Sequence, residues 1–199
     1  MADWEPGYAL AELNTGRFFK DPAQKYTIKT VALTKDSIIT MGGLHILPDI
    51  TVDEIRPEDA ALLILPGGET WLEPQHAPIL RITEQFLDEG IYTAAICGAT
   101  YALAQAGMLD TRTHTSNNLQ SLKSTCPNYQ GEQYYRNEPS VTDENLITAS
   151  GIAPVEFAYN ILQCLDVFSD DTLQAWYDLF RTRKEQYFYA LMQSLPQAE

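Results

Sequence analysis

The sequence is poor in the residues that several classes of protein require. Its three cysteines are widely spaced with no Cys-x-x-Cys pair, and its three histidines are scattered, so we expect neither a disulfide framework nor a bound metal. Lysine and arginine number 13 against 27 acidic residues, and the net charge of -14 argues against binding to nucleic acid or to an anionic membrane. The longest apolar runs, such as residues 60–65, are too short to cross a bilayer.

Three further observations bear on the cellular location, the class of protein and the number of domains. The first six residues contain no basic stretch followed by an apolar run, so no signal peptide is indicated and a cytoplasmic location is expected. Hydrophobic residues make up 45% of the chain, which is a globular composition. A length of 199 residues is ample for one α/β domain with a sizeable core, whereas two full domains would be cramped.

Strand and helix patterns alternate along the chain. Residues 27–33 alternate in polarity as a strand does, and residues 37–50 indicate a hairpin around two glycines. Residues 60–65 and 91–96 are continuous apolar runs, typical of strands buried on both faces. A further short strand is expected at residues 146–149, and helices are expected at residues 8–13, 79–86, 98–107 and 154–165. The alternation predicts an α/β fold in which a mostly parallel sheet has helices on both faces, so ligands bind beyond the C-terminal ends of the strands.

Residues 169–199 differ in character from the rest. Ser169 is a plausible N-cap, and large apolar side chains then recur at helical spacing through residues 173–180 and again through residues 188–195. Such a stripe is most often core or dimer surface, and a lid over the active site is the minority interpretation. We therefore expect a main domain of residues 1–168 with a C-terminal helical extension, residues 169–199, packed on it.

The strongest chemical signal is the strand–turn–helix pattern around Cys97. The buried strand runs directly into small residues and then a helix, which is the layout of a nucleophile elbow with cysteine in place of serine. Free N–H groups at the helix N-terminus favour the thiolate, so we expect a lowered Cys97 pKa and a strained backbone, with positive φ at Cys97. The plainer alternative is a small, inert core cysteine. We expect Cys164 to be buried and Cys126 to be an ordinary thiol.

Three weaker signals accompany the elbow. Gly67 and Gly68 follow a buried strand and allow backbone N–H groups to approach a ligand, although such a pair is often only a turn. Glu5 precedes the start of a helix, where the helix dipole stabilises a carboxylate, so the residue needs no catalytic role to be explained. His114 follows the helix after Cys97, in a polar stretch where a lone histidine is more often simply exposed.

Together these pieces resemble the PfpI/ThiJ superfamily, which belongs to the class I glutamine amidotransferase-like folds. Residues 3–6 are similar to its first loop, whose glutamate hydrogen-bonds the reactive cysteine. Residues 66–68 are similar to its second loop, residues 95–99 to its elbow, and residues 149–158 to its last strand-to-helix turn. The likeness covers roughly residues 2–166. It implies a flavodoxin-like three-layer sandwich, a small-molecule substrate, a homodimer and no cofactor.

The resemblance also implies a set of site residues. Cys97 is the nucleophile, Glu5 its acid/base partner and His114 a nearby proton carrier. The remaining members are the backbone donors for an oxyanion and two pocket residues: Gly67, Gly68, Gly98, Trp71 and Asn117. Substrates known for relatives include reactive aldehydes, amides and nitrile-like groups.

Three departures from the family pattern limit the function. Gly98 stands where protease-like members carry a histidine, which weakens a peptidase interpretation. Glu156 lacks the histidine that true glutamine amidotransferases place two residues before it. The family begins with a buried central strand before the loop of Glu5, where this chain has Met1. The leading hypothesis is a cysteine-dependent small-molecule hydrolase, lyase or hydratase. The alternatives are a redox or stress sensor that oxidises at Cys97 and, less favoured, an amidotransferase subunit.

Overall fold

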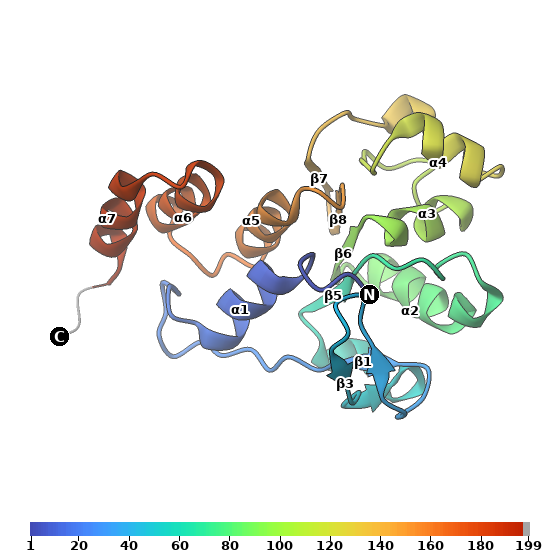
Figure 1. The fold of residues 1–199 in the computed structure, drawn as a ribbon, viewed down its shortest axis with the longest axis horizontal. Coiled ribbons are helices and arrows are strands. Elements are labelled where there is room, and N and C mark those ends of the chain that lie inside the picture. The colour runs from blue at the N-terminus through green and yellow to red at the C-terminus, as the bar shows by residue number, and fades with distance from the viewer. Residues whose placement is uncertain (197–199) are drawn as a thin grey trace.

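A four-stranded sheet forms the centre of the computed structural model, which describes residues 1–196 (Figure 1). The strand order is β5–β6–β8–β7, with β5 (Leu62–Leu65), β6 (Tyr92–Ile96) and β8 (Leu146–Ala149) parallel and β7 (Ser140–Asp143) antiparallel to β8. The two apolar runs of the sequence are thus neighbouring strands, and their C-terminal ends share one edge of the sheet.

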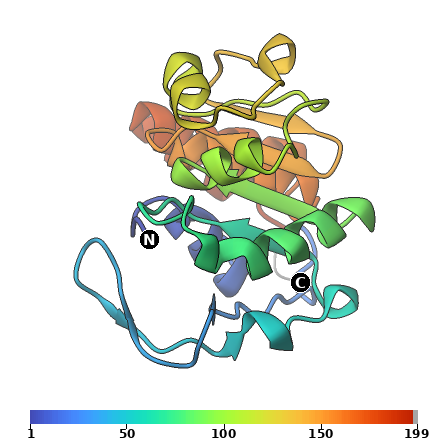
Figure 2. The same ribbon diagram turned by 90° about the vertical axis from the view of Figure 1, so that its right-hand side faces the viewer.

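Helices cover both faces of this sheet, which makes the fold a flavodoxin-like α/β sandwich (Figures 1 and 2). On one face, α1 (Gly7–Thr15) and α5 (Pro154–Cys164) contribute Leu13, Phe157 and Ile161 to one core cluster. On the other face, α2 (Ala77–Asp88) and α3 (Gly98–Gln105) contribute Phe86 and Leu103 to a second. Strand residues enter both clusters because alternate side chains point to opposite faces.

The remaining elements are short. β1 (Val31–Ala32) pairs in parallel with β4 (Ile50–Thr51), and β2 (Ile38–Ile39) pairs with β3 (His45–Ile46) in the predicted hairpin. The strand expected at residues 27–33 is only two residues long, since Thr30 N–H donates to the Asp49 carboxylate instead of a neighbouring strand. The sequence patterns did not indicate β7 or α4 (Leu119–Thr125). Residues 1–196 also contain four 3₁₀ turns: η1 (Val52–Glu54), η2 (Pro57–Asp59), η3 (Pro74–His76) and η4 (Glu132–Tyr134).

The first residues of the chain lie at the outer edge of β5. Ala2 N–H donates to the Gly67 carbonyl (3.0 Å), and Met41 N–H donates to the Met1 carbonyl (2.9 Å). In residues 1–196 no strand pairs with this edge of β5, so nothing there takes the place of the family's first central strand. The two bonds nevertheless fix residues 1–2 beside the end of β5, and Glu5 follows directly.

The C-terminal helices are tied into the first core cluster. α6 (Asp170–Thr182) begins at Ser169, whose Oγ accepts from Thr172 N–H as an N-cap, and α7 (Glu185–Ser194) packs on α6. Trp176 is fully buried, and its Nε1–H donates to Glu12 Oε1 (3.1 Å). Glu12 is itself buried and accepts two hydrogen bonds from Arg17. The aromatic stripe thus supplies core on α6, while α7 leaves two large side chains about half exposed: Phe188 and Tyr189.

Removing the Trp176 side chain should therefore destabilise the whole domain. We expect Trp176→Ala to lower the free energy of unfolding by about 3–5 kcal/mol, because the change opens a large cavity and leaves a buried carboxylate oxygen without its indole partner. Phe188→Ala on α7 is the matched control and should cost less than about 1 kcal/mol. Urea unfolding followed by circular dichroism measures both, and equal losses would show that α6 is peripheral to the core.

Candidate active site

Cys97 occupies the turn between β6 and α3 with a positive φ, at φ 58° and ψ -122°. The predicted positive φ is confirmed, and such values are rare for a residue with a side chain. Neighbours hold the turn on both sides: Cys97 N–H donates to Ala149 O (3.0 Å), and Thr100 Oγ1 donates to Cys97 O (2.7 Å). The thiol is half-buried at the C-terminal end of the parallel strands.

The Glu5 carboxyl is buried beside this thiol. Its Oε2 accepts from Gly67 N–H (2.5 Å), and its Oε1 has no partner of ordinary hydrogen-bond geometry within residues 1–196. A Cβ placed on Gly151 would lie 2.7 Å from Cys97 Sγ and 3.1 Å from Glu5 Oε1, so the free oxygen and the sulfur face the same glycine. Burial raises the pKa of Glu5, although the Gly67 donor and the Cys97 thiol oppose the shift.

Two N–H donors approach the sulfur from other directions. Asn117 Nδ2 donates to Cys97 Sγ at 3.4 Å, while Asn117 Oδ1 accepts from Gly151 N–H (2.8 Å) and so fixes the orientation of the amide. The Gly98 N–H is the second donor. Asn117 was expected only to line the pocket, and the structure places it in direct contact with the thiol.

The expected lowering of the Cys97 pKa is wrong. Burial raises the pKa of the thiol most, and the neighbouring Glu5 charge raises it further. The Asn117 and Gly98 donors pull the pKa down but do not offset the other two causes. The other two cysteines also differ from expectation, because Cys126 is buried with its Sγ donating to Tyr101 O (3.2 Å) and Cys164 is only partly buried.

The three predicted glycines have different tasks. Gly67 N–H is already bonded to Glu5, so Gly67 is not available as an oxyanion donor. Gly68 N–H has no partner in the described chain, and a Cβ on Gly98 would collide with the Gly68 carbonyl oxygen and lie 3.2 Å from Gly68 N. The two backbones approach so closely that a side chain at position 98 does not fit, which accounts for glycine where protease-like members carry histidine.

The structure does not bring His114 to Cys97. The His114 side chain is fully buried, its Nδ1 bonds Arg112 O (2.6 Å) and its Nε2 bonds the Tyr129 hydroxyl (2.7 Å). Both ring nitrogens are therefore occupied, and burial lowers the His114 pKa and favours the neutral ring. The position of His114 in the sequence, 17 residues after Cys97, could not predict this burial, because the burial depends on Tyr129 and Tyr135 from the following loop.

Trp71 lies against the loop after β5, where a Cβ on Gly68 would be 3.7 Å from its ring. Its Nε1–H donates to Pro66 O (2.8 Å), and its ring packs against His76 with centroids 5.2 Å apart. The side chain lines a hollow between the loop after β5 and helices α2 and α3. Sequence reasoning missed Trp4 and Gly151, whose Nε1 and carbonyl oxygen are hydrogen-bonded (3.1 Å). The glycine in the last strand-to-helix turn was the available signal.

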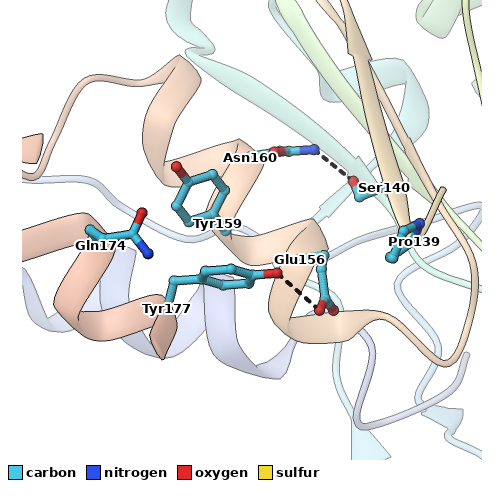
Figure 3. Close-up of a pocket in the computed structure, with 7 residues that line it drawn as sticks. All are labelled: Pro139, Ser140, Glu156, Tyr159, Asn160, Gln174 and Tyr177. Atoms are coloured by element: carbon cyan, nitrogen blue, oxygen red, sulfur yellow. Dashed lines mark hydrogen bonds between the residues drawn. The ribbon is translucent and has the colours of Figure 1, made fainter. Parts of the chain in front are cut away.

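A second hollow lies between α5, α6 and the start of β7 (Figure 3). Tyr177 donates to Glu156 Oε1 (3.3 Å), and Asn160 Nδ2 donates to Ser140 Oγ (2.8 Å). Glu156, the residue compared above with the glutamate of amidotransferases, thus faces Tyr177 in this hollow.

These features define an α/β protein with a cysteine on a strand–helix elbow and a buried glutamate beside it. The model of the DJ-1/PfpI family matches residues 1–164, and the chain belongs to that family. It is 52% identical to the Bacillus subtilis protein named uncharacterized protease YoaZ, over 98% of this chain and 93% of that protein. Over 46% of this chain and 55% of the relative, it is 28% identical to a Pyrococcus furiosus protein named deglycase PfpI.

A solved structure supports the same assignment. The ThiJ/PfpI family protein from Bacillus anthracis superposes with a TM-score of 0.95 at 54% identity, covering 99% of this chain and 93% of that one. Names such as protease and deglycase indicate that the family includes enzymes. In residues 1–196 no helix is long and apolar enough to cross a membrane.

The neighbouring Glu5 carboxylate predicts how the alkylation rate of Cys97 depends on pH. Iodoacetamide labelling from pH 6 to 10 should give Cys97 a midpoint above the ~8.5 of a free thiol, since the pKa is raised. Glu5→Gln should move that midpoint down, because it removes the negative charge that opposes the thiolate. Glu69→Gln, an exposed neighbour of Gly68, is the control and should leave it unchanged. A wild-type midpoint below 8.5 would contradict the assigned pairing.

Proposed function

We propose that this protein is a cysteine-dependent enzyme that adds Cys97 Sγ to an electron-poor carbon of a small molecule. One observation supports the proposal above all: the thiol stands at the C-terminal edge of a parallel sheet, between a buried carboxyl and convergent N–H donors. A nucleophile, a base and a polarising group within reach of one atom are the parts that covalent catalysis requires.

Glu5 supplies the base that this thiol needs. Because the Cys97 pKa is raised, the resting side chain carries its proton at neutral pH and is a poor nucleophile until that proton is removed. Glu5 Oε1 is the unpartnered oxygen on the same side of Gly151 as the sulfur. A carboxyl with a raised pKa can take the proton during attack and return it to the leaving group.

The electron flow for a carbonyl substrate follows from these positions. The S–H bond breaks and its proton passes to Glu5, the Sγ–carbon bond forms, and the carbonyl π pair moves onto oxygen. The free Gly68 N–H, beside Gly98 at the elbow, is the donor suited to that oxyanion. Hydrolysis, hydration and lyase chemistry on aldehydes, amides or nitrile-like groups all begin with such an addition.

The other interpretations have less support. Peptide hydrolysis fits poorly with an elbow that excludes a histidine at position 98, although two relatives carry the name protease. Glutamine amidotransfer lacks its histidine, and Glu156 is engaged by Tyr177. A peroxide sensor works through a low-pKa thiolate, whereas the pKa of Cys97 is raised.

An activity panel of amides, glyoxals and isonitriles tests the proposal. We expect at least one class to be turned over by the wild type, with activity lost to background in Cys97→Ala and lowered roughly 10²–10⁴-fold in Glu5→Gln. Cys164→Ala, which removes a partly buried thiol outside the site, should match the wild type. For the wild type, kcat/KM should fall as pH drops through the raised pKa of Glu5, since the protonated carboxyl is no longer a base. Activity retained by Cys97→Ala would end the proposal.

A further inference from the structure

Two large apolar side chains flank the Cys97 site, and the chemistry above does not use them. Trp4 is 53% exposed and Ile152 is 93% exposed, although both residues adjoin buried ones. Trp4 directly precedes Glu5, and Ile152 directly follows Gly151. Trp4 is hydrogen-bonded to the residue before Ile152, so the two exposed apolar residues belong to one part of the surface beside the site, and grouped apolar surface marks a binding site more often than a single residue does.

Contacts at Gly151 fix the Trp4 indole, and the backbone that leads into Ile152, relative to the sulfur. Gly151 is the residue whose missing Cβ would touch Cys97 Sγ and Glu5 Oε1. Its N–H is bonded to Asn117 Oδ1 (2.8 Å), and its carbonyl accepts from Trp4 Nε1–H (3.1 Å). Because the only polar atom of the indole is occupied, the exposed part of the Trp4 ring offers an apolar surface alone.

The contacts of the site residues include no basic side chain that could bind an anionic substrate. Within residues 1–196, the hydrogen bonds and ion pairs of Cys97, Glu5, Asn117 and Gly151 include no lysine or arginine. Glu5 is itself acidic, and the chain carries a net charge of -14. A carboxylate or phosphate on the substrate would find no lysine or arginine among these contacts and would lie beside the acidic Glu5.

We propose that Trp4 and Ile152 select substrates that carry an uncharged apolar group, such as an aryl or branched alkyl group, next to the reactive carbon. The proposal rests on the function proposed above in taking Cys97 as the attacking group. It adds a substrate class and two specificity-determining residues.

Labelling of Cys97 tests the selection without depending on turnover. The probes are iodoacetamide and its N-benzyl derivative, with the ratio of their rates at Cys97 normalised to the ratio for free cysteine. We expect the wild type to favour the benzyl probe by about tenfold, and Trp4→Ala with Ile152→Ala to remove most of that preference. Phe188→Ala is the control, because Phe188 is about as exposed as Trp4 but belongs to α7, which lies far from the N-terminus (Figure 1). Equal ratios in all variants would overturn the proposal.

Trp4→Phe separates contact from positioning. This variant keeps an apolar ring but loses the bond to Gly151, so it should retain most of the benzyl preference if Trp4 contacts the probe. A Trp4→Phe ratio equal to that of Trp4→Ala would show that Trp4 only positions Gly151, against the proposal. Light scattering measures the oligomeric mass of the same variants. If Ile152→Ala changes the mass but leaves the ratio of the two labelling rates unaltered, Ile152 belongs to an interface between copies of the chain, and the proposed selection is overturned.

Substrate turnover distinguishes this proposal from the function on which it rests. Phenylglyoxal and glyoxylate are the matched pair, with an apolar and an anionic substituent, and the wild type should prefer the first by at least about tenfold in kcat/KM. If no substrate of the activity panel is turned over but Cys97 still reacts preferentially with the benzyl probe, the proposed enzyme activity is refuted and the selection by Trp4 and Ile152 stands. If phenylglyoxal and glyoxylate are turned over equally well, the proposed enzyme activity stands and the selection by Trp4 and Ile152 is refuted.

Discussion

The close approach of three backbone segments around Cys97 is the constraint on which the rest of the site depends. The turn at Cys97 has positive φ, and the glycines at 67, 98 and 151 stand where a Cβ would strike Glu5, Gly68 or the sulfur itself. This packing brings a buried carboxyl, a thiol and an amide together without a metal-ligand cluster in residues 1–196. Strain at one residue is maintained because strands and loops on every side fix its neighbours.

Placing a carboxyl and a thiol together in a poorly solvated space suppresses the ionisation of both groups and makes the reactivity of the thiol depend on the substrate. Burial raises the pKa of both groups, so the resting pair keeps its proton and the sulfur is little ionised. A thiol held in this way resists casual oxidation and alkylation. It becomes reactive when a substrate stands where the proton can pass to Glu5, and reactivity is thereby coupled to binding.

Local patterns predicted much of the fold, and tertiary contacts decided the remainder. The apolar runs at 60–65 and 91–96, the Ser169 N-cap and the elbow at Cys97 depend on short-range rules, and all appear in the structure. β7 and α4 have polar sequences that match no simple period. The burial of His114 and Cys126 and the engagement of Gly67 by Glu5 involve partners far away in sequence, and no pattern around those residues reports them.

The bond between Trp176 and Glu12 joins the two ends of the chain across the core. Glu12 lies on α1, which begins two residues after Glu5, so the position of the proposed base depends on a helix that is held from the far end of the sequence. During synthesis, Cys97 and its elbow leave the ribosome well before Trp176 does. We therefore expect the nascent chain to carry an exposed, unpaired thiol until α6 docks, and the site to be assembled only in the last stage of folding.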